Sequence, residues 1–444
     1  MTPYTYSKSV PVAESYDVLV VGSGSAGAIA AIAAARCGAR TLILERLPFI
    51  GGTSTAVLDT FYGFYTPGKQ SKKVVGGIPD DVIAGLKKYG VLLERPNTHG
   101  AGTGVTYHPE YLKVVWEELL QQAGVRMLLG AWVQDVAGGG PRVEGLIVAT
   151  KSGLRRFDAK IIVDASGDAD ICHFAGIGYE LAGKISPAQT LTTTFKMVNV
   201  EMDRRRSVPK DTFHKLMAVA AESGQYALPR KEGSDHITPV DHMTATVLTR
   251  LPSCFGNGVD FVNATDPELL SAAEIEGRRQ AIEYIRFLHD KVPGYEHAQL
   301  AAFSTHIGVR ETRRVYGDYR LTKEDVLEAR KFEDQIGLCG APIEDHHEGS
   351  GTTWSYLPEG QCVGIPYRTL LPKGAENLLV AGRCFSATHD AHASVRSMAQ
   401  CMSMGQAAGT AAAMAVQHRC QPRDVEMPAL RENLLRHGAI LEMS

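Results

Sequence analysis

The chain has 444 residues, of which 44% are hydrophobic and 21% are charged, and its formal net charge is −3. This length is too great for one simple core and predicts two closely connected domains. The near-neutral charge gives no reason to expect nucleic-acid binding or attraction to anionic membranes. No apolar run approaches a membrane-spanning length, and residues 1–14 lack the features of a secretory signal. We therefore expect a cytoplasmic protein.

Cysteine and histidine patterns argue against metal or disulfide chemistry. The eight cysteines are scattered, and no two of them form a Cys-x-x-Cys pair. Cys384 stands beside Arg383 and is a candidate activated thiol. Residues 344–348 include two adjacent histidines, but adjacent side chains diverge on a strand or a helix and seldom bind one ion. We expect no metal site.

The N-terminal region predicts the start of a Rossmann-type nucleotide-binding domain. Residues 16–21 are apolar and run directly into a glycine-rich turn, which indicates a buried parallel strand. Residues 26–36 are rich in Ala and Ile and are followed by Gly38, which predicts a helix with a glycine cap. Residues 41–44 predict a second strand, closed by Glu45.

Gly22, Gly24 and Gly27 form a G-x-G-x-x-G motif in this strand–turn–helix context. Gly22 permits the tight turn, Gly24 lets the backbone approach a pyrophosphate, and Gly27 lets the helix pack close to the strand. The helix N-terminus supplies N–H groups for the phosphates. Glu45 follows at the spacing of an acid that binds a ribose diol, and its charge would repel the 2′-phosphate of NADP.

The middle of the chain predicts an antiparallel meander. An amphipathic helix over residues 109–123 precedes strand-like runs at 125–129, 131–136, 142–150 and 154–157, which are separated by glycine-containing turns. A further apolar strand over residues 160–165 ends in Ser166-Gly167-Asp168.

Towards the C-terminus, residues 377–381 predict a buried strand and residues 395–416 a long Ala- and Met-rich helix, with Ser394 as its N-cap. Small residues form one face of this helix, which predicts close packing against a sheet or a cofactor: Gly405, Ala408, Gly409 and Ala412.

Several motifs now support a family resemblance, namely Gly51-Gly52-Thr53-Ser54-Thr55, the block 308–314, Gly364-Ile365-Pro366-Tyr367-Arg368, the block 377–383 and Ala393-Ser394-Val395-Arg396. With the helix, meander and terminal strand, they resemble the FAD-dependent oxidoreductases with a glutathione-reductase-like flavin fold of the two-dinucleotide-binding-domain type. The resemblance spans nearly the whole chain and is weakest from about residue 200 to 300.

The resemblance implies FAD as the cofactor and an α/β fold, in which a Rossmann-like FAD-binding domain (parallel sheet plus antiparallel meander) carries an inserted α+β substrate domain. We assign residues 12–65, 105–189 and 351–420 to a discontinuous FAD-binding domain. Residues 66–104 and 190–350 are assigned to a substrate or cap domain, and residues 421–444 to a C-terminal tail. Segment 66–104 is either a solvated loop or a flap over the flavin.

The resemblance and the motifs together define the expected cofactor-binding residues: Gly22, Gly24, Ser25, Ala26, Gly27, Glu45, Arg46, Gly52, Thr53, Ser54, Val133, Gly167, Asp168, Gly382, Arg383, Ser394, Val395 and Arg396. In a flavin fold the N-terminus of the C-terminal helix and Arg396 would face the N1/C2 edge of the ring and stabilise its reduced state. The alternative for Arg396 is an ordinary ion pair.

Oxidation by a flavin requires a C–H bond held over the ring and a base for the accompanying proton. His389 and His392 are the candidate bases because they precede the C-terminal helix; the alternative for each histidine is a hydrogen bond to the backbone. Arg313 is the third candidate catalytic residue, within a cluster that includes Arg310 and Arg314 and is suited to clamp a carboxylate.

Two alternatives compete with this interpretation of the side chains. The alternative for the arginine cluster is a set of ion pairs with Glu311 and Asp318. Tyr62 and Tyr65 either line the pocket or fill the core.

The sequence therefore predicts an FAD-dependent oxidoreductase that transfers a hydride between a small organic substrate and flavin N5, with a second electron acceptor or donor that the sequence does not specify. A flavin-dependent monooxygenase is the first alternative, because that class also carries a Gly-Asp pair such as Gly167-Asp168. A non-enzymatic FAD-binding protein is the second.

Overall fold

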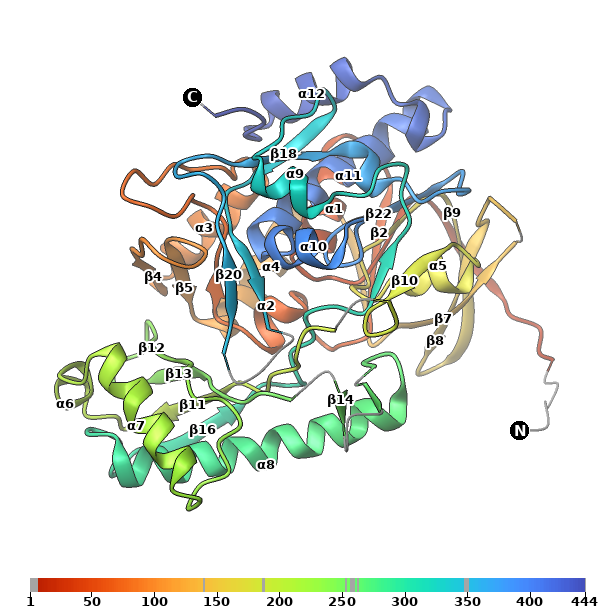
Figure 1. Cartoon of the computed structure of the whole chain (residues 1–444). Coiled ribbons are helices and arrows are strands. Elements are labelled where there is room, and N and C mark those ends of the chain that lie inside the picture. The colour runs from red at the N-terminus through yellow and green to blue at the C-terminus, as the bar shows by residue number, and fades with distance from the viewer. Residues whose placement is uncertain are drawn as a thin grey trace.

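The computed structural model describes residues 7–138, 140–185, 188–251, 254–255, 260–261, 263–346 and 351–443. Figure 1 shows an upper lobe built around a large sheet and a lower lobe formed by the middle of the chain. Within the described part of the chain, no helix has both the length and the apolar character needed to cross a membrane.

The large sheet of the upper lobe has seven strands in the order β6-β2-β1-β9-β8-β7, with β22 also paired to β9. Its parallel part contains β1 (Val12–Val21), β2 (Thr41–Glu45), β6 (Arg126–Leu129), β9 (Gly153–Asp164) and β22 (Leu378–Val380). Its antiparallel part joins β7 (Trp132–Ala137) and β8 (Gly145–Thr150) to β9. This confirms a Rossmann-like sheet with an antiparallel meander.

Strand β9 differs from the sequence prediction, which divided it into residues 154–157 and 160–165. The structure shows one continuous strand that pairs with β1 along most of its length. Its first half also pairs with β8, and its last residues pair with β22. The two apolar runs are therefore two segments of a single strand that faces different neighbours.

Two helices pack against each other on the sheet, namely α1 (Ser25–Arg36) and α11 (Met398–His418). A Cβ atom added at Gly405 would lie 2.2 Å from the carbonyl oxygen of Ala26, and one added at Gly409 would lie 2.1 Å from that of Ala30. The small face of α11 thus allows direct backbone contact with a helix, whereas the sequence predicted contact with a sheet or a cofactor.

The upper-lobe core also includes segments that the sequence analysis assigned elsewhere. In segment 66–104, Val74, Val82 and Leu86 are buried in this core, and α3 (Ile78–Lys88) packs against α4 (Pro109–Gln122). A small sheet of β3 (Thr60–Phe61), β5 (Gly104–Tyr107) and β4 (Leu92–Arg95) lies beside them. This segment is therefore neither a separate cap nor a solvated loop, because its apolar residues are needed to complete the core.

The C-terminal segment 421–444 is not a detached tail either. Its helix α12 (Met427–Arg436) contacts α11, and Leu430, Leu434 and Leu441 are buried in the same core. The four-residue spacing places Leu430 and Leu434 on one face of α12, and Leu441 reaches the same core after the turn at Gly438.

Residues 313–346 likewise pack with the upper lobe. Strand β17 (Arg313–Val315) pairs with β10 (Tyr179–Leu181), and β18 (Gln335–Cys339) pairs with β21 (Val363–Pro366). The antiparallel pair of β19 (Ile343–Asp345) and β20 (Thr353–Ser355) follows, and a short helix α9 (Lys323–Leu327) lies between β17 and β18.

The lower lobe is an antiparallel sheet with helices on it, and it spans residues 195–303 (Figure 1). Its strands are β12 (Ser234–Ile237), β13 (Thr244–Val247), β11 (Phe195–Val198) and β16 (Gln299–Phe303), in that order. The helices are α6 (Met202–Arg206), α7 (Lys210–Glu222) and α8 (Pro267–Lys291). Phe195, Phe213 and Phe287 lie in a core of its own.

The α1–α11 contact yields the first testable prediction. We expect Gly409→Val to lower the free energy of unfolding by about 2 kcal/mol or more, because the added side chain overlaps the backbone of α1. Urea unfolding followed by circular dichroism measures the change. As a control, Val219→Ala on the exposed face of α7 should change stability by less than about 0.5 kcal/mol. Equal stability of the two variants would contradict the contact.

Candidate cofactor and substrate site

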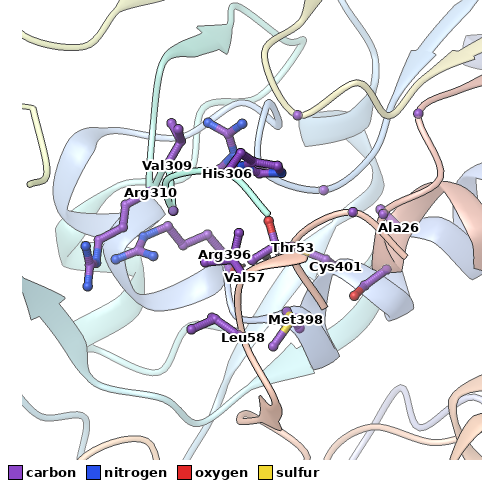
Figure 2. Close-up of a pocket in the computed structure, with 18 of the residues that line it drawn as sticks. Ala26, Thr53, Val57, Leu58, His306, Val309, Arg310, Arg396, Met398 and Cys401 are labelled. Carbon is purple, nitrogen blue, oxygen red and sulfur yellow. Dashed lines mark hydrogen bonds between the residues drawn. The ribbon is translucent and has the colours of Figure 1, made fainter. Parts of the chain in front are cut away.

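A cavity lies at the carboxyl edge of the parallel sheet, between the two lobes (Figure 2). Open α/β sheets bind their ligands at this edge. Segments far apart in the sequence line the cavity, and the expected cofactor residues among them are Gly22, Gly24, Ser25, Ala26, Glu45, Arg46, Gly52, Thr53, Gly167, Asp168, Gly382, Arg383 and Arg396.

The three glycines of the early motif have different roles. Gly22 has a φ of +86°, and a Cβ atom there would lie 2.5 Å from the carbonyl oxygen of Ala165. A Cβ atom at Gly27 would lie 1.9 Å from the carbonyl oxygen of Gly22. Gly24 has an ordinary φ of −60°, and a Cβ atom there would meet nothing within 4 Å. The protein packing explains Gly22 and Gly27, whereas at Gly24 the open space belongs to the cavity.

This open space fits the diphosphate of FAD. It lies at the N-terminus of α1, where backbone N–H groups and the helix dipole favour anions. The Oγ atom of Ser25 also lines the cavity and is buried without a hydrogen-bond partner among the described residues. A buried hydroxyl of this kind requires an acceptor, and a phosphate oxygen would provide one.

Glu45 is held rigidly on the cavity wall after β2. Its Oε2 accepts hydrogen bonds from the backbone N of Ser23 at 2.8 Å and from the Oγ of Ser23 at 2.6 Å. Its Oε1 accepts from the backbone N of Leu47 at 2.8 Å. A carboxylate fixed here suits a ribose diol and opposes the 2′-phosphate of NADP.

Asp168 and Arg383 form a charged pair on the same wall. The Nη2 atom of Arg383 lies 2.7 Å from the Oδ1 of Asp168, which also accepts a hydrogen bond from Thr312 at 2.6 Å. Burial alone would raise the pKa of Asp168, but Arg383 and Thr312 outweigh it, and the pKa is lowered. The aspartate is therefore ionised and holds Arg383 in place.

The helix expected to begin at residue 395 is two helices in the structure. Helix α10 (His389–Val395) ends at Arg396, and α11 begins after Ser397. Ser394 is therefore not an N-cap: it lies inside α10, and its Oγ donates to the carbonyl oxygen of Ala341 at 2.6 Å. Ser397 is the N-cap instead, and it lines the cavity, so the positive end of α11 still opens there.

Five of the expected cofactor residues do not line the cavity, among the residues that the structure describes. Gly27 serves helix packing, and the Oγ of Ser54 donates to the carbonyl oxygen of Gly51. Val133 is buried in the core under the meander, and Val395 in the core beneath α11. Ser394 is the fifth.

The three predicted catalytic residues also lie outside the cavity lining. The Nε2 atom of His392 donates to the carbonyl oxygen of Arg383 at 2.7 Å, and burial lowers the pKa of this histidine well below its usual range. Arg313 donates to the backbone oxygen of Asp168 and to the carboxylate of Asp170, both at 2.9 Å. Both residues contact the wall of the cavity from behind.

His389 is buried between two carboxylates. Its Nδ1 lies 2.9 Å from Glu311, and its Nε2 lies 3.4 Å from Asp345. Burial would lower the pKa of His389, but Asp345 and Glu311 outweigh it and raise the pKa to about 9. A histidine that is protonated at neutral pH is a poor general base.

The three arginines of the cluster differ in their contacts. Arg314 is buried and pairs with Glu180 and Glu311. Asp318 pairs instead with Arg423. Arg310 alone of the three arginines lines the cavity. The ion-pair interpretation thus holds for Arg314, and the ligand-binding interpretation stays available for Arg310.

The remaining candidate residues also differ in where they lie. Tyr62 lines the cavity, whereas Tyr65 packs against the core. Cys384 is buried, and burial raises the pKa of its thiol well above the usual value, so it is not an activated thiol. No cluster of three or more potential metal ligands occurs within the described ranges, and residues 347–350 lie outside them.

His306 is a candidate functional residue that the sequence did not indicate. His306 lines the cavity, as Figure 2 shows. Its Nδ1 lies 2.8 Å from the carbonyl oxygen of Ile307, which can only accept, so the neutral ring carries its proton there and leaves Nε2 as the basic nitrogen. Burial lowers its pKa and keeps the ring neutral near pH 7. A lone histidine beside the least family-like segment gave no sequence signal.

The glycine turn, the acid after β2 and the meander define a class of protein, the flavoproteins with a Rossmann-like FAD-binding domain. Comparison with known families agrees. The model of the family described as FAD dependent oxidoreductase matches residues 17–434, and the chain belongs to this family.

The chain is also similar to curated reductases. Digeranylgeranylglycerophospholipid reductases from Thermoplasma volcanium and Thermoplasma acidophilum are 25% and 26% identical over 239 residues, which cover 50% of this chain and 56% of each relative. The chain thus spans about half the length of these relatives.

Among solved structures, a geranylgeranyl bacteriochlorophyll reductase-like protein from Thermoplasma acidophilum has 14% identity and a TM-score of 0.47, with 95% of this chain and 83% of that chain covered. CabE, an aromatic hydroxylase from angucycline biosynthesis, has 15% identity and a TM-score of 0.47, with 95% and 67% covered.

The contrast between Gly24 and Gly27 gives a prediction. We expect Gly24→Val to fold with its stability changed by no more than about 1 kcal/mol in the flavin-free state, yet to lose FAD, because the side chain fills the phosphate space. Gly27→Ala should instead lower the stability of the flavin-free protein by about 2 kcal/mol or more. Flavin absorbance per protein and thermal unfolding measure both. Stoichiometric FAD in Gly24→Val would refute the site.

Proposed function

We propose that this enzyme transfers a hydride between a small organic substrate and N5 of bound FAD. The observation that carries the proposal is a single cavity with two chemically different ends. One end has the open space at Gly24 and the N-terminus of α1, and the other has Arg310 and His306. FAD, when bound, supplies a two-electron hydride acceptor or donor.

The chain's own residues would bind and orient the cofactor. Gly24 and Ser25 at the N-terminus of α1 hold the phosphates, and Glu45 holds the ribose. At the other end, the N-terminus of α11 and Arg396 place positive potential on the cavity wall. This potential favours the negative charge that the cofactor gains on reduction.

The lower lobe would provide the substrate half of the site. Val247 of β13 and Leu270 of α8 line the cavity, together with Thr194 just before β11. Apolar side chains here exclude water from the reacting atoms, and water exclusion strengthens each polar contact inside. A small organic molecule would lie between this lobe and the cofactor.

His306 is the proposed proton acceptor, because it is the neutral histidine whose ring lines the cavity. For His389 and His392 we propose positioning roles. His392 donates a hydrogen bond to the backbone of Arg383. His389 lies between the carboxylates of Glu311 and Asp345 and thus links the two segments that carry them.

The role of His306 is testable by single-turnover reduction. We expect His306→Asn to retain FAD and to slow substrate-dependent flavin reduction by about 100-fold or more. In the wild type the rate should fall as the pH drops through the pKa of His306, which lies below 6.5, because protonation removes the base. The variant should lose this dependence.

Two comparisons make the experiment decisive. His418→Asn, on the exposed end of α11, should leave reduction unchanged. If His306→Asn reduces the flavin at the wild-type rate, the assignment of the base to His306 is wrong.

The reaction class itself is tested with purified FAD-loaded protein. We expect at least one metabolite in an anaerobic screen to bleach the flavin without oxygen, because hydride transfer needs no third reactant. NADPH-driven oxygen uptake with an oxygenated product would show the monooxygenase alternative instead.

A further inference from the structure

Two arginines line the cavity at the end away from the glycine turn. Arg310, from the segment before β17, and Arg396, from the break between α10 and α11, both line it. Figure 2 shows their side chains running towards the same side of the cavity, with the guanidinium groups near each other. Two acids also line the cavity, Glu344 of β19 and Glu274 of α8, which accepts from the backbone N of Ile307 at 2.7 Å.

The hydrogen bonds of the two arginines are incomplete. The Nη1 atom of Arg310 donates to the carbonyl oxygen of Thr190 at 2.6 Å and to the Oγ1 of Thr192 at 2.7 Å. Within the described ranges, the rest of this guanidinium and the whole guanidinium of Arg396 have no hydrogen-bond partner, and the Nε of Arg396 is buried. Of these donors only the Nε of Arg396 is fully buried, and the others can donate to an acceptor in the cavity.

Several charged groups surround the two arginines. Burial lowers the pKa of Arg310 to about 9, and the nearby Arg396 and Arg230 add to the shift. Burial would raise the pKa of Glu344, but His346, Arg396 and Arg310 outweigh it and lower the pKa to about 2. Glu344 and Glu311 both favour the charged form of Arg396.

Other ionisable groups lie nearby. Burial lowers the pKa of His346 to about 4, so its ring is neutral. Arg250 adds positive charge, and it donates to the backbone oxygens of His346 and Gly351. Asp345 is engaged with His389 and with the side chain of Gln189.

Apolar side chains adjoin the arginines. Val57, Leu58, Val309 and Met398 line the same part of the cavity, as Figure 2 shows. A ligand that satisfies both surfaces needs an anionic group with oxygen acceptors at one end and an apolar body next to it.

We propose that Arg310 and Arg396 clamp the carboxylate of the substrate, whose apolar body lies against Leu58 and Val309. A planar guanidinium matches a carboxylate with paired N–H···O bonds, and two of them share one anion readily. The inference deepens the proposed hydride-transfer function by naming a substrate class, carboxylic acids with an apolar body, and it rests on that function only for the step after binding.

The test uses the FAD-loaded enzyme and phenylacetate as the probe, with phenylacetamide as its neutral isostere and inorganic phosphate as a second anion. Binding is followed by calorimetry and by the shift of the flavin absorption spectrum. We expect phenylacetate to bind and phenylacetamide to bind at least about 10-fold more weakly. Arg310→Met should weaken phenylacetate binding by about 10- to 100-fold while FAD content stays stoichiometric.

Matched variants separate the clamp from a general loss of structure. Arg423→Met removes a surface arginine that pairs with Asp318, and it should leave phenylacetate binding unchanged. Arg310→Lys keeps the charge but not the paired geometry and should bind with intermediate affinity. If Arg310→Met fails to fold, Arg310→Lys and Arg396→Met provide the comparison.

Equal affinity for phenylacetate and phenylacetamide would overturn the inference, as would tighter binding of phosphate than of phenylacetate. The calorimetry can be repeated on flavin-free protein. Carboxylate binding that depends on Arg310, in a protein whose flavin no substrate reduces, would contradict the proposed function and support the clamp. Flavin reduction by neutral substrates alone would support the proposed hydride transfer and contradict the clamp.

Discussion

The site depends on the backbone contact between α1 and α11. Gly405 lies against Ala26 and Gly409 against Ala30, so residue numbers rise together along the contact and the two helices run parallel. Parallel helices present their N-termini at the same edge of the sheet. The positive ends of both helices therefore open on one cavity, the first at the glycine turn and the second at Ser397. Side chains any larger at these glycines would separate the helices and the two ends of the site.

Four arginines, Arg46, Arg310, Arg383 and Arg396, also line the cavity. They are matched in number by four acids, Glu45, Asp168, Glu274 and Glu344, so the uncompensated positive potential is that of the two helix ends. A dinucleotide brings two phosphate charges to the first end, and a carboxylate would bring one to the second. The electrostatics of the empty cavity thus complement a cofactor and a substrate that are both anionic.

The parts of this site that the sequence predicted are those with local signals. Gly22, Gly24 and Glu45 lie within one strand–helix–strand unit. Turn geometry and residue spacing in such a unit depend on neighbouring residues, so the sequence predicted that these three residues line the cavity. The break at Arg396 was missed because Ser394 and Ser397 are equally good caps on sequence grounds, and packing against Ala341 decides between them. His306 was missed because its position depends on how the lower lobe joins the sheet.

The role of the buried charged residues around Glu311 also depends on the tertiary structure. Glu311 accepts the backbone N–H of Gln189 at 2.6 Å and an ion pair from Arg314 at 2.6 Å, and it lies 2.9 Å from His389. Ions buried this deeply are tolerated because each has partners. The network joins the segment of Arg310 to α10, whose end carries Arg396. Residues that the sequence suggested as catalytic would thus hold the two arms of the proposed clamp at a fixed separation.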